Sequence, residues 1–220
     1  MHRVIMRVKV GWMGIGSFLY QQLGHPKGRF GHCLLRFLNW ANSPMNRLTI
    51  SCLQPSDQDH VLEIGFGGGN LIKQLAQLGL PNQFTGLERS AEALYLCEKQ
   101  YHPLINQGRI HLHTTQATTL PFDAGQFNKI CSINALYFWP NPIDILAECK
   151  RVLSPNGTLY LCYNTKDLLD LYGFTHIGLR GYTVTQIETF FSEAGFGNIQ
   201  TTSARSLRNG SFYCSYGMAS

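Results

Sequence analysis

The feature that most constrains this chain is a glycine-rich turn between a short apolar strand and an amphipathic helix. The apolar residues of 61–64 predict a buried strand, glycines follow at positions 65, 67, 68 and 69, and a helical pattern begins at Leu71. Glycine lets a ligand approach the main chain closely, and a helix N-terminus offers free N–H groups to an anion. The sequence therefore predicts a nucleotide-type ligand at this turn.

The spacing of the glycines separates two classes of ligand. The dinucleotide fingerprint G-x-G-x-x-G would place its third glycine at position 70, which is Asn70. Glu63 and the glycines at 65, 67 and 69 instead spell E-x-G-x-G-x-G. This stretch resembles motif I of the Rossmann-like (class I) S-adenosylmethionine (SAM) methyltransferases. The pattern disfavours NADH and a dehydrogenase, and a glycine turn that serves packing alone is the competing interpretation.

Strand and helix patterns alternate after the turn, which implies a parallel α/β sheet with right-handed crossovers. Asn209-Gly210 predicts a hairpin between two terminal strands. Ser43, Ser90 and Thr183 are expected to be N-caps of helices. The resemblance implies a Rossmann-like, seven-stranded, mostly parallel sheet with helices on both faces, a terminal antiparallel hairpin and an N-terminal helical lid. Strands are expected at 60–64, 84–88, 110–114, 127–139 (with its loop), 158–163, 199–204 and 211–218, and 164–182 is expected to be irregular.

Two later segments extend the resemblance over residues 60–217. Residues 116–123 resemble the family's D-A-x-x-L-P-F-x segment, although Gln116 replaces the usual acid. Residues 148–157 match its E-x-x-R-V-L-x-P-x-G helix-to-strand turn, which we interpret as scaffold. Asn128 stands where the family has an aspartate. The resemblance implies SAM as cofactor and S-adenosylhomocysteine as product.

The same resemblance assigns the cofactor contacts. Glu88 ends the second strand, where a carboxylate can accept hydrogen bonds from the two ribose hydroxyls of an adenosine. Gln116 is expected beside the adenine, and Asn134 beside the methionine end. The expected cofactor-binding residues are Glu63, Gly65, Phe66, Gly67, Gly69, Asn70, Glu88, Arg89, Gln116, Ala117 and Asn134.

The sulfonium of SAM is a good leaving group, so the protein mainly aligns the acceptor and excludes water. If a general base is used, it is expected in the lid or in a loop that follows a strand. His25 is the first to test, because its Gly-His-Pro-Lys-Gly loop has little other reason to hold an imidazole. A packing role is the competing interpretation for each candidate. The candidates are His25, Tyr20, Tyr137, His176 and Tyr182.

Two histidines are candidates for a metal site. His111 and His113 alternate along one predicted strand and therefore point to one face. No acid or third ligand lies nearby in the sequence, so no metal site is predicted.

Charge is unevenly distributed along the chain. Residues 1–56 hold seven Lys and Arg and no Asp or Glu, although the whole chain has a net charge of only +5. We expect 1–56 to form an N-terminal helical lid or extension and 57–220 to form the SAM-binding domain. The basic residues are sparse, which favours a solvated helical face over a nucleic-acid or membrane surface. Residues 11–23 are too short and interrupted for a span, so an interfacial membrane helix is the alternative to a lid.

The seven cysteines are odd in number and contain no C-x-x-C pair, which indicates reduced thiols in a cytoplasmic protein. The expected function is methylation of a small-molecule acceptor, a metabolite or natural product, by in-line displacement. One alternative is a nucleic-acid methyltransferase, although residues 134–137 lack the prolines of an N-P-P-Y loop. The other is a non-catalytic SAM-binding protein. Oxygen, nitrogen and carbon acceptors, and the oligomeric state, stay open.

Overall fold

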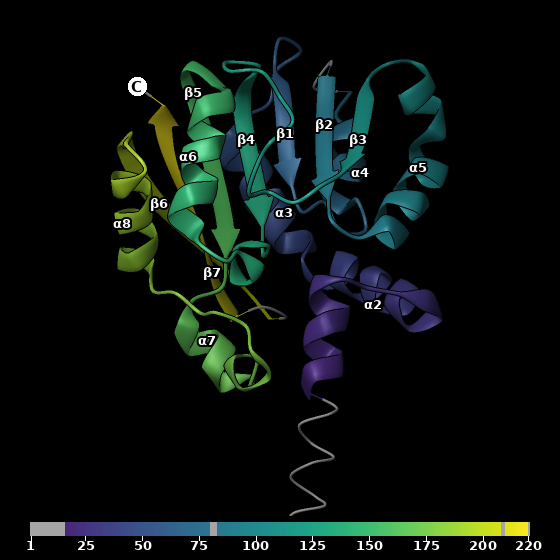
Figure 1. The fold of residues 1–220 in the computed structure, drawn as a ribbon, viewed down its shortest axis with the longest axis vertical. Coiled ribbons are helices and arrows are strands. Elements are labelled where there is room, and N and C mark those ends of the chain that lie inside the picture. Colours follow the sequence, from purple (N-terminus) through teal and green to yellow (C-terminus); the bar gives the residue numbers. More distant parts are fainter. Residues whose placement is uncertain (1–15, 80–82, 208–209, 220) are drawn as a thin grey trace, which may run out of the picture.

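The computed structural model describes residues 16–79, 83–207 and 210–219 (Figure 1). They form a seven-stranded sheet in the order β3-β2-β1-β4-β5-β7-β6, in which β1 to β5 are parallel and β7 runs antiparallel to both of its neighbours. This confirms the predicted fold class and terminal hairpin. Asn209 lies outside the described residues. The strands are β1 His60–Ile64, β2 Gln83–Glu88, β3 Ile110–Thr114, β4 Phe127–Ile133, β5 Leu153–Tyr163, β6 Phe196–Ser206 and β7 Gly210–Ala219.

Helices cover both faces of the sheet because successive strand residues point to opposite sides. Leu62 and Ile64 of β1 pack with α6 and α8, whereas Val61 packs with α3, α4 and α5. Residues 16–24 are also helical. The labelled helices are α2 Gly28–Ala41, α3 Ser43–Leu53, α4 Asn70–Gln77, α5 Ala91–Asn106, α6 Pro142–Val152, α7 Lys166–Leu171 and α8 Val184–Glu193, with 3₁₀ turns η1 Leu136–Phe138 and η2 Thr175–Ile177.

The observed helix N-caps can be compared with those predicted from the sequence. Ser90 caps α5 by accepting a hydrogen bond from the Ala93 N–H, as expected, and Thr183 caps α8 in a reciprocal box with Gln186. The expected Ser43 cap of α3 is wrong, because Asn42 occupies the cap position and Ser43 is already helical. Helix α2 ends at Ala41, so only Asn42 separates the two helices. Its side chain contacts Asn134 instead of capping α3.

Two segments differ from the expected elements. Residues 164–182, which are expected to be irregular, contain α7 and η2. The sequence does not predict α7, because a helix of only six residues shows too little periodicity. The buried Leu169 anchors α7 to the core. Strand β5 begins at Leu153 instead of 158, because Leu153 pairs with Phe127 across an irregularity in β4.

Helix α3 packs directly on the sheet, although it lies before the expected domain boundary at residue 56. Met45 is completely buried, and its carbonyl accepts a hydrogen bond from the Cys162 thiol of β5 at 3.6 Å. Asn46, Thr49 and Leu53 are also buried. Of the described helical residues before β1, 16–24 and α2 lie away from the sheet, beyond the carboxyl ends of the strands (Figure 1).

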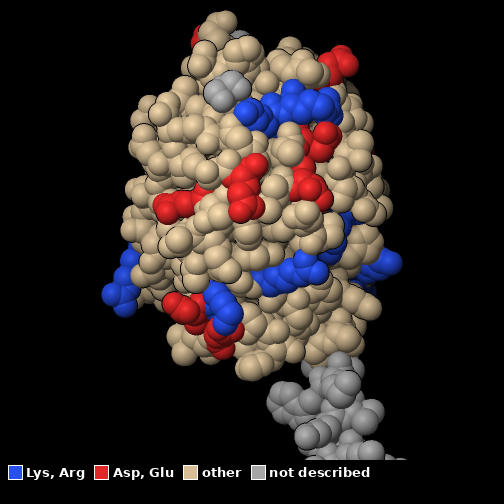
Figure 2. All heavy atoms as spheres, turned by 60° about the vertical axis from the view of Figure 1, so that its left-hand side comes forward, with Lys and Arg blue, Asp and Glu red and all other residues tan. Residues whose placement is uncertain are grey.

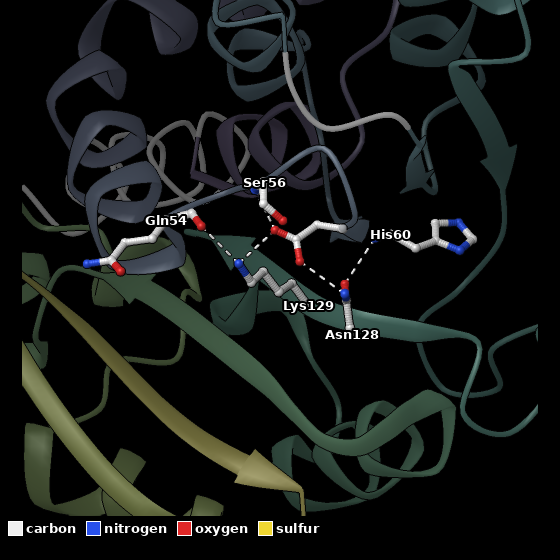
Figure 3. Close-up of polar contacts among 6 residues, drawn as sticks. Gln54, Ser56, His60, Asn128 and Lys129 are labelled. Carbon is white, nitrogen blue, oxygen red and sulfur yellow. Dashed lines mark hydrogen bonds and ion pairs between the residues drawn. The ribbon is translucent and has the colours of Figure 1, made fainter.

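A polar cluster fastens the opposite, amino-terminal end of β1 (Figure 3). Asp59 accepts hydrogen bonds from the Ser56 N–H at 2.6 Å, Lys129 Nζ at 2.7 Å and Asn128 Nδ2 at 3.0 Å. The Asn128 amide oxygen accepts from the His60 N–H at 3.0 Å. Burial alone would raise the pKa of Asp59, but the bonds and charge of Lys129 and the Ser56 contacts lower it. Asn128 therefore holds two strands together.

All seven cysteines are free thiols, and five of them are buried. Among the described residues, no helix is long and apolar enough to cross a bilayer. No group of three or more His, Cys, Asp or Glu in this part of the chain is placed to hold a metal ion. His111 and His113 are both exposed on β3.

Candidate active site

A cavity of about 670 Å³ opens at the carboxyl ends of β1, β2 and β4 and is lined by residues of the glycine turn and of α2. In open parallel sheets, ligands bind at the carboxyl ends of the strands, at the point where the strand order changes direction. In this sheet that point lies between β1 and β4, because β2 and β3 follow on one side of β1 and β4 and β5 follow on the other. Of the eleven expected cofactor-binding residues, ten line the cavity, and only Gly69 does not. Gly69 precedes α4, and its carbonyl accepts a hydrogen bond from the Tyr101 hydroxyl.

The glycine turn needs glycine for two different reasons. Gly65 has φ of 82°, and a Cβ there would lie 2.7 Å from the Cβ of Ala135. Gly67 has φ of 52° and faces open space, where the nearest atom to a Cβ is 4.0 Å away. The first glycine permits close packing of the turn on the loop after β4, and the second leaves main chain bare toward the cavity.

Glu88 shapes the turn as well as facing the cavity. Its Oε2 accepts a hydrogen bond from the Gly67 N–H at 2.9 Å, and its Oε1 accepts from the N–H groups of Arg89 and Ser90 at 2.8 and 3.0 Å. Each carboxylate oxygen has two lone pairs, so Oε2 retains capacity for a hydroxyl donor. Glu88 can therefore hold the loop and accept from a ribose.

Glu63 is the one buried carboxylate of the described residues with an oxygen that lacks a partner. It is 3% exposed, lines the cavity, and its Oε2 has no hydrogen-bond donor. Burial, followed by the charge of Glu88, raises the pKa of Glu63 to about 8. A buried acceptor without a donor is costly, so this position suits a cationic or N–H-bearing ligand. The sulfonium and ammonium of SAM meet that requirement.

Asn134 connects the elements around the cavity. It adopts φ of 57° directly after β4, and its Nδ2 donates to Asn42 Oδ1 at 3.2 Å. Its Oδ1 accepts a hydrogen bond from the Tyr137 hydroxyl at 2.8 Å, and that hydroxyl accepts from the Asn164 N–H at 2.6 Å. Burial raises the pKa of Tyr137 far above its usual value, so the hydroxyl keeps its proton. Tyr137 is thereby placed as a positioning residue for Asn134.

The other expected base candidates do not line the cavity. Tyr20 packs its ring on Phe138 at 5.7 Å, Tyr182 packs on Phe190 at 5.2 Å, and His176 is exposed on η2. His25 lies between Gly24 and Pro26, which do line the cavity.

The pKa of His25 is lowered by burial and then by the charges of Lys27 and Arg89, against the opposing charge of Glu88, so the imidazole is neutral at pH 7. A neutral imidazole is the form in which histidine can accept a proton.

Sequence reasoning missed the contacts that α2 makes with the turn. The Asn39 amide donates to the Gly68 carbonyl at 2.8 Å, and the Asn70 amide donates to the Asn39 carbonyl at 2.8 Å. Residues 24–26 contact the loop that follows β2, where Arg89 donates to the Gly24 carbonyl and Ser90 donates to the Pro26 carbonyl. The signal in the sequence for these contacts is Asn39, a polar residue among the apolar residues of α2.

Known proteins place this architecture in a class. Residues 62–161 match the family model described as "Methyltransferase domain". A methyltransferase in complex with the Haloferax volcanii Trm112 activator superposes with a TM-score of 0.76 at 17% identity, covering 84% of this chain and 93% of that one. Residues 62–161 therefore correspond to a methyltransferase domain, for which SAM is the implied cofactor, and the superposition and the strand order show the Rossmann-like (class I) fold.

Two curated methyltransferases are similar to this chain in sequence over part of their length. One is 28% identical over 59% of this chain, the phthiotriol/phenolphthiotriol dimycocerosates methyltransferase 1 of Mycobacterium ulcerans. The other is 30% identical over 46% of this chain, the ubiquinone biosynthesis O-methyltransferase of Haemophilus ducreyi. The matches span 52% and 43% of these relatives' own lengths. The chain therefore spans about half the length of each of these relatives.

Proposed function

We propose that this protein transfers the methyl group of SAM to a small, largely apolar acceptor by in-line displacement. The observation that carries the proposal is the mixed lining of the cavity. The glycine turn, Glu63 and Glu88 line it, and so do apolar side chains of α2, η1 and α7. We assign the cofactor to the first set and the acceptor to the second, which we call the acceptor wall.

The residues present fit SAM. Glu88 is suited to the ribose hydroxyls, and Glu63 is suited to a positive charge, because one of its oxygens is buried without a donor. Gln116 and Ala117 line the cavity beyond β3, where we assign the adenine. SAM supplies an electrophilic methyl group with a good leaving group, so the protein's part is to bind, orient and exclude water.

The acceptor wall is apolar and offers no ionised base. It includes Phe37, Phe138, Leu168 and Tyr172, and the Tyr137 hydroxyl is occupied by Asn134 and Asn164. We infer that the acceptor brings its own nucleophile, with neutral His25 as the remaining candidate base. The name of the ubiquinone biosynthesis relative supports an oxygen acceptor as the first to test.

We further propose that residues 16–41 act as the lid. Their contacts with the site are concentrated at Gly24, Pro26 and Asn39, each hydrogen-bonded to a loop that lines the cavity. Two of these contacts involve the pair Arg89–Ser90, and the Arg89 guanidinium also lies over the Phe138 ring at 5.3 Å. Such a small number of polar contacts would allow the segment to open for exchange of ligands.

The test is transfer of label from methyl-labelled SAM to a panel of long-chain alkylphenols, with RNA as a second substrate. We expect label in the organic extract, and Glu88→Ala should weaken SAM binding by about 100-fold through loss of charged hydrogen bonds. Glu98→Ala, an exposed glutamate of α5, is the matched control. Transfer to RNA alone would favour the nucleic-acid alternative, and tight SAM binding without any transfer would favour a non-catalytic protein.

His25 has its own test. If it accepts a proton from the acceptor, His25→Gln should lower kcat by about 100-fold while leaving the SAM dissociation constant unchanged. The wild-type rate should then fall as pH drops below the lowered pKa of the imidazole. A pH-independent rate with full activity in the variant would remove His25 from the mechanism.

A further inference from the structure

Helix α2 has two apolar faces. Gly31 and Leu35 are buried on one of them. On the other face Phe30, Phe37 and Trp40 are 49%, 57% and 53% exposed. Positions seven and three residues apart lie on one side of a helix, so these three rings form a stripe. A helix that buries one face and exposes a second aromatic face presents a surface for contact.

The aromatic stripe is continuous with its surroundings. Phe18, on the helical residues 16–24, packs its ring on Phe30 at 5.3 Å, and Phe37 packs on Trp40 at 5.9 Å. We call Phe18, Phe30, Phe37 and Trp40 the aromatic face. Phe37 also lines the cavity, so the aromatic face reaches the cavity mouth.

Other exposed apolar side chains gather at the same end of the molecule. Helix α7 lies beyond the carboxyl ends of the strands, as α2 does (Figure 1). Leu171 of α7 is 74% exposed, and Tyr172 beside it lines the cavity. Leu207 lies in the link between β6 and β7, at the end of β7 that pairs with the carboxyl end of β5. Of these three residues, Tyr172 lines the cavity, and Leu171 and Leu207 lie at the same end of the molecule.

The charge around the aromatic face is positive. Lys27, Arg29 and Arg36 are exposed beside it, and residues 16–56 contain no acid. Glu92 of α5 contacts α2, where it pairs with His32. On the face turned forward in Figure 2, by contrast, acidic and basic side chains are mixed and most of the surface is uncharged. Exposed aromatics beside cations, with no neighbouring acid on the same helix, match the chemistry of an anionic lipid surface.

We propose that the aromatic face docks this protein on an anionic lipid bilayer, with the cavity mouth turned toward the lipid. The rings would enter the interfacial layer while Arg29 and Arg36 meet the phosphates. A second copy of the chain fits less well, because a twofold contact through this face would bring the cations of the two copies together. Docking is independent of catalysis. Only the corollary, that an apolar acceptor enters from the lipid, rests on the proposed function.

The test is cosedimentation of the full chain with vesicles, without SAM. We expect binding to vesicles of equal parts phosphatidylglycerol and phosphatidylcholine, much weaker binding to pure phosphatidylcholine, and loss of binding in high salt. Arg29→Gln with Arg36→Gln should weaken binding by about 25-fold, given the usual contribution of each cation near an anionic surface. Phe30→Ser with Trp40→Ser should weaken it by at least about tenfold, because two aromatic rings no longer leave water.

Matched controls separate the face from general properties. Leu78→Ser removes a comparably exposed apolar side chain from the far end of α4, and Lys73→Gln with Lys99→Gln removes two exposed charges elsewhere. Each variant should retain the wild-type thermal midpoint and SAM affinity. No vesicle binding, or binding unaffected by the α2 variants, would overturn the proposal. A wild-type dimer that the aromatic variant converts to monomer, without lipid binding, would overturn it in favour of a second copy.

Discussion

The two ends of β1 each hold a buried carboxylate, and the two are treated in opposite ways. Asp59, just before the strand, is 6% exposed and accepts three hydrogen bonds, one of them from Lys129. Glu63, near the other end, is 3% exposed and has an oxygen without a donor. The pKa of Asp59 is lowered, whereas that of Glu63 is raised to about 8. One end of the strand is built for stability, and the other retains unmet capacity for a ligand.

The largest effect that separates the two ends is expected at Glu63. Its pKa of about 8 in the folded protein lies above the ordinary 4.5, so the folded state holds a proton that the unfolded chain releases. As the pH rises from about 5.5 to about 8, loss of this proton should therefore lower the free energy of unfolding by about 3 kcal/mol. Urea unfolding without ligand measures that slope. Glu63→Gln should remove it, and identical slopes in the two proteins would contradict the comparison.

Asp59 should behave in the opposite direction. Its lowered pKa means that its contribution to stability is present above the unfolded-state pKa and is lost as the pH falls through the folded-state value. Asp59→Asn should reduce the free energy of unfolding at pH 7 by about 2 kcal/mol, since Lys129 loses its buried partner. The SAM dissociation constant should stay unchanged, and a loss of SAM affinity would show that the two ends are coupled.

The smallest effect is expected from Asn128→Asp, which would place a second carboxylate where an amide now donates to Asp59 at 3.0 Å. Repulsion between the acids should cost about 1 kcal/mol of unfolding free energy at pH 7. The double variant Asp59→Asn with Asn128→Asp exchanges donor and acceptor and should recover most of that loss. Chemical denaturation of the four proteins forms a double-mutant cycle, and strict additivity would refute this role for the pair.

Much of this architecture could be predicted from local sequence. The apolar strands, the Ser90 and Thr183 caps and the glycine turn are short-range signals, because each depends on neighbouring residues. The sequence does not predict the helix at 166–171, because six residues give fewer than two turns of periodicity. The sequence predicts Ser43 as the cap of α3, because it does not show that α2 ends at Ala41 and leaves Asn42 alone between the two helices.

The site was predictable only where a motif spans it. Glu63, Glu88 and the glycines lie in segments that resemble motifs, and they meet at the cavity. The contact of Asn39 with Gly68 joins residues 29 positions apart through the packing of α2, which no local pattern specifies. The unpartnered oxygen of Glu63 also depends on the surrounding fold. Neighbouring residues in the sequence determine local propensity, but they do not determine which distant residues bury a side chain.

The central claim is that the cavity binds SAM with Glu63 ionised beside its positive charge. The most direct measurement is calorimetric titration of SAM at pH 7 in buffers of different ionisation heat, with NADH as the negative control. Because a cation favours the charged carboxylate, SAM binding should release close to one proton from the wild-type protein and none from Glu63→Gln. Binding of NADH without SAM, or SAM binding with no proton released, would contradict the account.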